Sequence, residues 1–461
     1  MAKSIIVIGG GTGGYVAAIR AAQLGAQVTL IEKDALGGTC LNRGCIPTKA
    51  LLQSADMLAK IKEAGVFGIS AGKVSIDFSA VTKRKNAVVE QLVSGVTFLM
   101  KKNKVKVIEG IATLIDSKTV EILGGSERVT ADNIIIATGS KPSTIPVKGI
   151  DESGVITSDE ALVMEQSPKS IVIIGGGVIG LEFAQIMSRL GSEVIIVEMM
   201  PQILPTEDTE VANMLGGILE KDGIKIFTSA TVKSIASAGR KGSLVSFTTK
   251  DGKGEQEVIV EKVLLSVGRQ PNTDDLGVDK LGLAMEKGRI VANERMETNI
   301  PGVYAVGDVI GGLMLAHVAM DEGKCAAENI MGADCKIDYW AVPRCVYTSP
   351  ELAGVGITEA EAKEEYGDIK VGRFPFKANG KALILDETAG MVKIIAEARY
   401  KQILGVQILG PHATGLIAEA VLGIKMEATL EEIAATIHAH PTLSEAVLEA
   451  ALNAEGKTIH F

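Results

Sequence analysis

Two cysteines five residues apart are the side chains in this sequence best suited to redox chemistry. Cys40 and Cys45 lie in GGTCLNRGCIPTK, residues 37–49, which has paired glycines at its start and a lysine at its end. On an ideal helix, residues at this spacing have Cα atoms roughly 8.7 Å apart, whereas an unstrained disulfide spans about 7 Å at most. A disulfide here therefore requires a distorted helix start, which the three glycines of the stretch permit. Strained, accessible disulfides are the labile kind that serve catalysis, so we interpret the pair as a redox couple.

A second interpretation stays open, in which both cysteines are thiols buried at the start of a helix. The redox interpretation makes its own prediction about reactivity. Thiolates near a helix N-terminus, and near the cations Arg43 and Lys49, have lowered pKa values. We therefore expect both thiols to react near neutral pH.

A duplicated unit must position this pair. The segment IVIGGGTGGYVAAIRAAQLGAQVTLIEK, from Ile6, is echoed 166 residues later by VIIGGGVIGLEFAQIMSRLGSEVIIVEM, from Val172. Each copy reads as an apolar run, G-x-G-x-x-G, a helical pattern and a second apolar run ending in an acid, which predicts a βαβ unit. Five positions match between the copies: Gly9, Gly11, Gly14, Gly25 and Glu32 in the first, and Gly175, Gly177, Gly180, Gly191 and Glu198 in the second.

This pattern predicts two dinucleotide sites. The glycines permit a tight turn, a close approach of the backbone to a pyrophosphate and close packing of helix on strand, while the helix N-terminus faces the phosphates. The terminal Glu accepts hydrogen bonds from a ribose. One such motif alone could be a mere glycine-rich turn, but here strand, helix and acid fall in register twice.

The position of the cysteines indicates which cofactor each of the two dinucleotide sites binds. Cys40 lies eight residues after Glu32, so the first site adjoins the thiols and suits FAD, which leaves the second site for a nicotinamide. At the second site Glu198 is followed by Met199 and Met200, with no arginine nearby. A carboxylate repels a 2′-phosphate, so the sequence favours NAD over NADP.

Two further features complete the domain prediction. A second pair of segments is similar: DNIIIATGSKPS, from Asp132, and EKVLLSVGRQPN, from Glu261. In addition, an apolar strand in residues 298–309 ends near Asp308, whose carboxylate suits a ribose or ribityl hydroxyl. From about Trp340 the pattern changes to strands followed by helices. We predict an α/β fold with two Rossmann-like domains, for FAD and NAD, and a C-terminal α+β domain. The predicted bounds are 1–145 for the first part of the FAD domain, 146–272 for the NAD domain, 273–340 for the second part of the FAD domain and 341–461 for the C-terminal domain.

Composition narrows the class of partner. A chain of 461 residues predicts about three domains, and the net charge of −9 argues against nucleic acid or an anionic membrane as partner. No apolar run reaches the roughly 18 residues of a membrane helix. Because the first glycine motif begins at Gly9, a cleaved signal peptide would remove functional sequence, so we expect a cytoplasmic or organelle-mature protein.

Cys325, Cys335 and Cys345 fit no zinc spacing; we expect no metal site and interpret these cysteines as reduced thiols in packed positions.

Taken together, these motifs resemble the pyridine nucleotide-disulfide oxidoreductases. The cysteine stretch, both glycine motifs, ATGS, YAVGD, LMLAH (residues 313–317) and HAHPTLSE (residues 438–445) carry the resemblance, which runs from Ile5 to about Leu452. It is strongest to members that oxidise protein-bound dihydrolipoamide and pass hydride to NAD. The resemblance implies that Cys40 meets the substrate, that Cys45 faces the flavin and that the chain forms a homodimer. It further implies flavin contacts from Thr39, Lys49, Thr138, Gly139, Ser140, Asp308, Met314, Leu315, Ala316 and His317, and nicotinamide contacts from Glu182, Val232 and Gly268.

The far end of the chain holds the candidate base. TLEE, from Thr429, predicts a capping box that begins a helix, and Pro441 is expected to end that helix near His440. The resemblance assigns His440 as the acid/base across the dimer interface, with Glu445 orienting its ring. Alternatively, Thr442 and Glu445 form a capping box of their own, and the carboxylate only satisfies a helix terminus.

Other functions stay open at this point. Glutathione reductase and mercuric reductase share the redox signature, although Glu198 argues against the phosphorylated nicotinamide of the former and the chain has no cysteine pair near its C-terminus for the latter. A flavoprotein that acts mainly as a docking subunit is the alternative from another class. The resemblance implies that the lipoyl group comes from a lipoyl domain of a 2-oxoacid dehydrogenase or glycine-cleavage complex.

Overall fold

Each copy of the duplicated unit forms a five-stranded parallel sheet. The computed structural model describes residues 2–123, 127–250 and 254–461. The first sheet has the order β20 (Val303–Ala305), β7 (Asn133–Ile136), β1 (Ser4–Ile8), β2 (Gln27–Glu32) and β3 (Lys106–Glu109). The second has the order β12 (Lys225–Phe227), β11 (Glu193–Val197), β10 (Ser170–Ile174), β16 (Lys262–Leu265) and β9 (Val155–Ile156). The central strands β1 and β10 are almost fully buried runs of Ile and Val, as expected for parallel strands covered on both faces.

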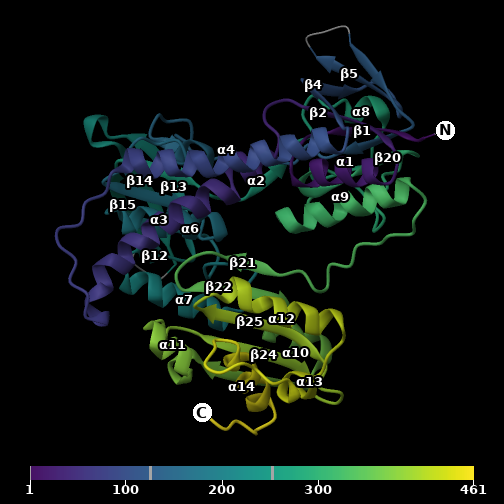
Figure 1. The fold of residues 1–461 in the computed structure, drawn as a ribbon. Helices are drawn as coiled ribbons and strands as arrows, with labels where there is room; N and C mark the ends of the chain where they lie inside the picture. Colours follow the sequence, from purple (N-terminus) through teal and green to yellow (C-terminus); the bar gives the residue numbers. More distant parts are fainter. Residues whose placement is uncertain (1, 124–126, 251–253) are drawn as a thin grey trace.

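The helices and small sheets around these two sheets also correspond. Helix α1 (Thr12–Gln23) follows β1, and α6 (Val178–Arg189) follows β10. Each unit also carries a three-stranded antiparallel sheet: β4 (Ile111–Leu114), β5 (Thr119–Leu123) and β6 (Arg128–Thr130) in the first, and β13 (Ala230–Ser237), β14 (Ser243–Thr249) and β15 (Glu255–Val260) in the second. Helix α9 (Ala316–Ile330) packs on α1. The two helices approach so closely that a Cβ at Gly323 would lie 2.2 Å from the carbonyl oxygen of Gly13, so only glycine fits there. Residues 303–330 thus belong structurally with the N-terminal unit (Figure 1).

The second pair of echoed segments joins the two units. Strand β8 (Ser140–Pro142) pairs antiparallel with β17 (Arg269–Pro271). These strands follow β7 and β16, so they lie where the chain crosses from one unit to the other. The long helices α3 (Cys45–Glu63) and α4 (Phe78–Lys102) pack side by side and extend from the first unit toward the second (Figure 1).

The C-terminal domain is an antiparallel sheet covered by helices. Its strand order is β21 (Arg344–Val346), β22 (Glu351–Gly356), β25 (Ile403–Gly410), β24 (Met391–Glu397) and β23 (Ile369–Pro375). Helices α12 (Ala413–Lys425) and α14 (Glu445–Ala454) pack on these strands, and α13 (Leu430–Ala435) packs on α14. The predicted capping box at Thr429 is present. The predicted end of its helix was wrong, because α13 ends at Ala435 and residues 436–444 form an irregular loop.

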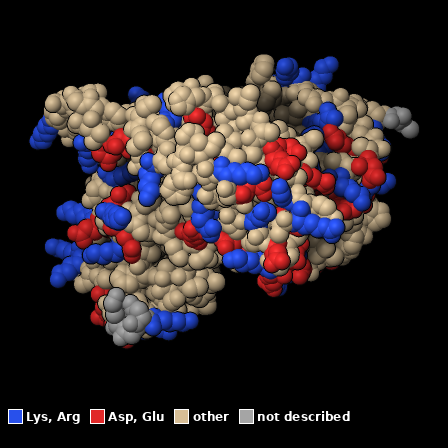
Figure 2. Space-filling model, turned by 90° about the horizontal axis from the view of Figure 1, so that it is seen from below, with Lys and Arg blue, Asp and Glu red and all other residues tan. Residues whose placement is uncertain are grey.

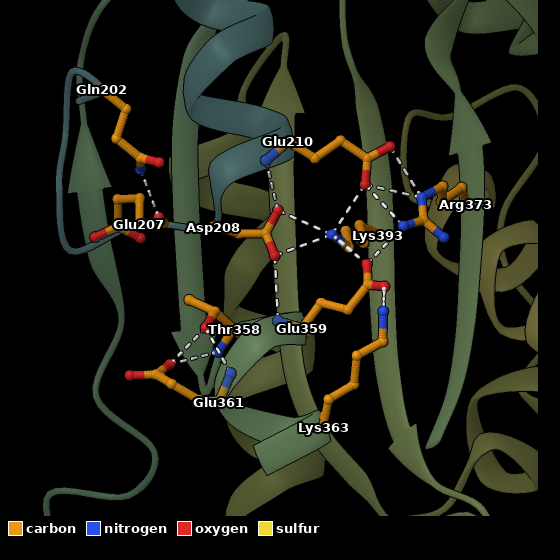
Figure 3. A network of polar contacts seen from close by, with 10 residues as sticks. All are labelled: Gln202, Glu207, Asp208, Glu210, Thr358, Glu359, Glu361, Lys363, Arg373 and Lys393. Atoms are coloured by element: carbon orange, nitrogen blue, oxygen red, sulfur yellow. Dashed lines mark hydrogen bonds and ion pairs between the residues drawn. The ribbon is translucent and has the colours of Figure 1, made fainter. Parts of the chain in front are cut away.

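A buried cluster of ions fixes the C-terminal domain to the second unit (Figure 3). Lys393 of β24 is only 2% exposed, and its Nζ lies 2.9 Å from both carboxylate oxygens of Asp208, which caps α7 (Thr209–Lys221). The same ammonium lies 2.9 Å from Glu210 and 2.7 Å from Glu359, the first residue of α10 (Glu359–Tyr366). We refer to these four residues as the Lys393 cluster. It joins two domains through a buried pair, Lys393 and Asp208, with the more exposed Glu210 and Glu359 beside it.

The surface is charged with both signs. Figure 2 shows acidic and basic side chains interspersed over the face that includes the C-terminal domain. Among the helices in the described part of the chain, none is both long and apolar enough to cross a membrane.

Candidate active site

The cysteine stretch forms two helices with a break between them. Helix α2 (Gly38–Arg43) carries Cys40, and α3 begins at Cys45. Gly44 separates them with φ −144° and ψ −115°, and a Cβ at this position would lie 2.9 Å from the carbonyl oxygen of Thr39. The distortion predicted from the spacing is therefore a break at a position where only glycine fits. Cys40 and Cys45 are free thiols joined by a side-chain hydrogen bond.

The two thiols differ in acidity. The hydrogen bond from Cys40 lowers the pKa of Cys45 to about 7; burial opposes this effect and the Lys49 ammonium reinforces it. The same hydrogen bond, together with burial, raises the pKa of Cys40. The prediction that both pKa values are lowered was therefore wrong for Cys40, because a hydrogen-bonded pair shares one proton and only one partner gains from losing it.

Lys49 lies one helical turn after Cys45 and forms an ion pair across two domains. Its Nζ donates to both carboxylate oxygens of Glu182 at 2.8 Å, and the Glu182 side chain is only 3% exposed. Tyr347, from the start of the C-terminal domain, donates its backbone N–H to Glu182 at 3.2 Å and places its ring 4.7 Å from the ammonium. Segments from three predicted domains thus meet beside the thiols.

Sequence reasoning assigned Lys49 and Glu182 to two different cofactors and missed their pairing. They are 133 positions apart, and nothing in the local pattern of either residue points to the other. Arg43 was expected beside the thiols, but its guanidinium forms an exposed ion pair with Asp34. Lys49 is therefore the cation that acts on Cys45.

Both glycine motifs have the shape of a phosphate cradle. Gly9 and Gly175 have φ of +102° and +107°, and a Cβ at Gly14 or Gly180 would lie 1.9 or 2.1 Å from the carbonyl oxygen of the first glycine in its motif. By contrast, a Cβ at Gly177 would meet nothing within 4 Å, and one at Gly11 only the Cα of Gly38 at 3.9 Å. Gly11 and Gly177 are also the N-caps of α1 and α6. The open side of each motif thus lies at a helix N-terminus, where a pyrophosphate fits.

The acids that end the second strands occupy equivalent positions. Glu32 accepts backbone N–H bonds from Gly10 at 2.6 Å and Asp34 at 2.9 Å. Glu198 accepts the corresponding bonds from Gly176 at 2.6 Å and Met200 at 2.7 Å. These bonds fix each carboxylate beside its glycine turn, the place where it would receive ribose hydroxyls. The residues present therefore fit two dinucleotides.

The crossing strands bring together most of the residues expected around the flavin's ribityl chain. Ser140 donates its hydroxyl to Asp308, and Thr138 donates its hydroxyl to the carbonyl of Asn272 at 2.7 Å. Arg269 donates to the hydroxyl and carbonyl of Ser140 at 2.7 and 2.9 Å and lies 3.9 Å from Asp308. Gly139, with φ +71°, forms the turn between Thr138 and Ser140. Arg269 was missed in the sequence, although its place in the second echoed segment was a usable signal.

The remaining expected contact residues lie on three segments. Thr39 lies on α2 between the glycine turn and Cys40. Met314 and Leu315 lead into α9, which begins with Ala316 and His317, and His317 lies 3.0 Å from the carbonyl oxygen of Pro343. Val232 is buried in β13, so its side chain is part of the core, whereas Gly268 is open on its Cβ side.

His440 and Glu445 form a pair on the surface of the C-terminal domain. His440 Nδ1 lies 2.8 Å from Glu445 Oε1, and the His440 side chain is 79% exposed. The other carboxylate oxygen accepts the N–H of Thr442 at 2.8 Å. The capping box expected at Thr442 was wrong, because α14 begins at Glu445 after Ser444 and the Thr442 hydroxyl donates to the carbonyl of Ala439. Helix α14 lies far from α2 within the chain (Figure 1). The exposed imidazole is thus free to face another molecule.

Comparison with known proteins agrees with this geometry. The family model described as pyridine nucleotide-disulphide oxidoreductase matches residues 3–323, and the dimerisation domain of the same family matches residues 342–451. A dihydrolipoyl dehydrogenase of Bacillus subtilis (strain 168) is 45% identical, with 99% of each chain covered. The mitochondrial dihydrolipoyl dehydrogenase of Pisum sativum is 44% identical over 100% of this chain and 93% of its own.

Solved structures have the same fold along nearly the whole chain. LpdA from Mycobacterium tuberculosis superposes with a TM-score of 0.90 at 28% identity, covering 97% of this chain and 99% of its own. The HOCl-induced flavoprotein disulfide reductase RclA from Escherichia coli gives a TM-score of 0.86 at 29% identity, covering 97% and 99%. The predicted fold class and oxidoreductase chemistry are confirmed. The chain belongs to the pyridine nucleotide-disulphide oxidoreductases, a family of flavoproteins that use FAD and NAD.

Proposed function

We propose that this chain oxidises dihydrolipoamide carried on the lipoyl domain of a partner and reduces NAD. The observation that carries the proposal is the arrangement of Cys45 at the start of α3, with Lys49 one turn away and held by Glu182. Relatives near 45% identity that are named dihydrolipoyl dehydrogenase over their full length support this choice of substrate. FAD, held by the residues around Gly11, Glu32 and Asp308, would supply a two-electron acceptor for the reduced cysteines and a hydride donor for NAD.

The unequal acidity of Cys40 and Cys45 sets the order of the thiol–disulfide exchange with the substrate. In the oxidised enzyme, a substrate thiolate attacks the sulfur of Cys40; the Cys40–Cys45 bond breaks and Cys45 leaves as a thiolate. A thiol of low pKa is the better leaving group, and the pKa of Cys45 is lowered to about 7. The second substrate thiolate then attacks the substrate sulfur bonded to Cys40, and Cys40 leaves and takes a proton. The substrate becomes a disulfide, losing two electrons, and the cysteine pair gains them.

The base for these steps comes from His440 of a second copy. The imidazole takes the proton of the attacking thiol, and Glu445 stabilises the resulting imidazolium. The exposure of His440, its distance from α2 in the same chain and the dimerisation-domain match support a homodimer. A lipoyl domain of a 2-oxoacid dehydrogenase or glycine-cleavage complex is the proposed substrate carrier.

The proposal extends to the cofactor sites and domain limits. The residues around Gly11, Glu32 and Asp308 hold FAD, and those around Gly177 and Glu198 hold NAD. The limits are those expected from the sequence, 1–145 with 273–340 for FAD, 146–272 for NAD and 341–461 for the interface. A cytoplasmic location also stays a prediction.

The test compares substrates in one purified preparation of the holoenzyme. We expect NAD reduction with dihydrolipoamide, and little NADH oxidation with oxidised glutathione. Cys45→Ser removes the leaving thiolate and is expected to reduce turnover by at least about 10³-fold, whereas Cys335→Ser, at a thiol outside the site, retains it. Full turnover in the Cys45 variant would contradict the mechanism, and a preference for glutathione would contradict the substrate.

A further inference from the structure

A second pair of thiols lies at the end of α9, away from Cys40 and Cys45. Cys325 is in the last turns of α9 and only 1% exposed, packed in the core between α1 and α9. Cys335 follows five residues after the helix ends and is partly exposed. Although these cysteines are ten positions apart, Cys335 packs against the core cluster that holds Cys325, and Asn329 contacts both residues. Both are free thiols.

Asn329 holds the two cysteines together. Its side-chain amide donates to the sulfur of Cys325 at 3.5 Å and to the backbone carbonyl of Cys335 at 2.9 Å, and its carbonyl oxygen accepts the N–H of Cys335 at 2.7 Å. The turn that brings the chain back includes Gly332, with φ +105°, whose N–H donates to the Asn329 carbonyl at 3.0 Å. The position of Cys335 over the helix is thus fixed by hydrogen bonds between the Asn329 side chain and the Cys335 backbone, which a bond between the sulfurs would leave in place.

The two thiols have different access to a reagent. Burial, the neighbouring Cys335 and the Glu328 carboxylate all raise the pKa of Cys325, so this thiol is protonated at neutral pH. Cys335 is the one that solvent reaches. A thiol in contact with solvent and backed by a second thiol is the arrangement of a reacting and a resolving cysteine.

We propose that Cys325 and Cys335 form an accessory redox pair that closes to a disulfide when the protein meets hydrogen peroxide. The Cys335 thiol gives up its proton, and its thiolate attacks one peroxide oxygen; the O–O bond breaks, the leaving hydroxide takes up that proton as water, and a sulfenic acid remains. The sulfur of Cys325 then attacks the sulfur of Cys335; the S–O bond breaks, and the leaving hydroxide takes the Cys325 proton to form a second water. Two thiols and one peroxide give one disulfide and two waters, so the sulfurs lose the two electrons that the peroxide gains.

The bond would protect the segment that follows α9. It stops the oxidation of Cys335 before the irreversible sulfinic acid. It also secures the chain that leads to Tyr339, whose hydroxyl donates to Glu322 at 2.8 Å, while Glu322 accepts the N–H of Gly307 at 2.6 Å. Gly307 directly precedes Asp308, so the segment buttresses a residue of the proposed flavin site.

Tryptic peptides separate the two thiol pairs. Cleavage after Lys324 and Lys336 leaves both Cys325 and Cys335 in one peptide, residues 325–336, whereas cleavage after Arg43 divides Cys40 from Cys45. The holoenzyme is reduced, desalted, treated with hydrogen peroxide, alkylated and digested without reductant. We expect the 325–336 peptide to lose two hydrogen atoms and to take up no alkyl group, and dithiothreitol to restore both alkylation sites.

Variants distinguish the two roles. In Cys325→Ser we expect Cys335 to form a sulfenic acid that dimedone traps when it is present, and to gain a second oxygen when dimedone is absent. In Cys335→Ser we expect Cys325 to stay unmodified, and Cys345→Ser is expected to behave as the wild type. The proposal is overturned if the wild-type peptide takes up two alkyl groups after peroxide, if Cys335 is overoxidised while Cys325 stays free, or if either bonds to Cys345. The wild-type measurement decides even if a variant fails to fold.

Discussion

Two lysine–carboxylate pairs bind the NAD domain to its neighbours, and they differ in what surrounds them. Lys49 and Glu182 join it to the helix that begins at Cys45, with Nζ–O distances of 2.8 Å. Lys393 and Asp208 join it to the C-terminal domain at 2.9 Å. The carboxylates are equally buried, but Lys49 is 29% exposed whereas Lys393 is 2% exposed.

The difference shows that two similar ion pairs can serve different roles, one in the reactivity of a thiol and the other in joining domains. Lys49 faces a single carboxylate, and its remaining field acts on the Cys45 thiol. Lys393 faces three carboxylates, and Arg373 and Lys363 neutralise the excess negative charge (Figure 3). An ammonium surrounded by several carboxylates, such as Lys393, stabilises the contact between two domains. An ammonium beside a single carboxylate, such as Lys49, can also stabilise a nearby thiolate.

The largest effect that tests this contrast is on stability. Lys393→Met keeps the length of the side chain but leaves Asp208 buried without its cation, whereas Glu210 and Glu359 keep their ion pairs with Arg373. Breaking a buried ion pair in this way costs about 3–5 kcal/mol, so we expect the free energy of unfolding, measured by urea titration, to fall by that amount.

The matched control removes a lysine outside the Lys393 cluster that pairs with one of its carboxylates. Lys363 donates to Glu359 at 2.6 Å but is 59% exposed, and an exposed pair of this kind is worth about 0.3–0.5 kcal/mol. Equal losses in Lys363→Met and Lys393→Met would show that burial does not separate the two contacts.

The next effect is on the acidity of Cys45. Lys49→Met removes the cation that lowers its pKa, so we expect the pKa to rise by about one unit. Glu182→Gln removes a carboxylate that raises the pKa of Cys45, so we expect a shift in the opposite direction. The measurement is the rate of alkylation of the reduced enzyme against pH, followed by mass spectrometry of the Cys45 peptide.

Arg43→Ala is the control for charge in that experiment. Because Arg43 forms an ion pair with Asp34, we expect the profile for Cys45 to stay unchanged. Shifts in the same direction for Lys49→Met and Glu182→Gln would mean that packing, rather than charge, sets the acidity.

The smallest effect is the response of the Lys393 cluster to acid. Burial disfavours the ionised form of Glu359, but hydrogen bonds from Lys363 and Lys393 outweigh it and lower the pKa to about 2 from an ordinary 4.5. A lowered pKa in the folded state means that the stabilisation is complete above about pH 4.5 and is lost as the pH falls toward 2. We expect the unfolding temperature of the wild type to fall more steeply over this range than that of Glu359→Gln. Parallel curves would contradict the assignment.

Local patterns predicted most of the fold because each is enforced within a short segment. The duplicated glycine motifs specified two βαβ units, since a strand, a tight turn and a helix follow from residues that are adjacent in sequence. The end of α13 was predicted wrongly: the helix ends at Ala435, five residues before His440, so Pro441 does not end it. The unequal acidity of the cysteines was also missed, because it depends on which sulfur donates to the other.

The two dinucleotide units, the cysteine pair and the acids at the ends of the strands could be predicted from the sequence, because their chemistry depends on spacing along one segment. The pairing of Lys49 with Glu182, the three carboxylates around Lys393 and the approach of Cys335 to Cys325 could be found only in the folded chain. Ion pairs and thiol pairs act over a few ångströms in space. Their partners here come from different elements, so packing alone selects them.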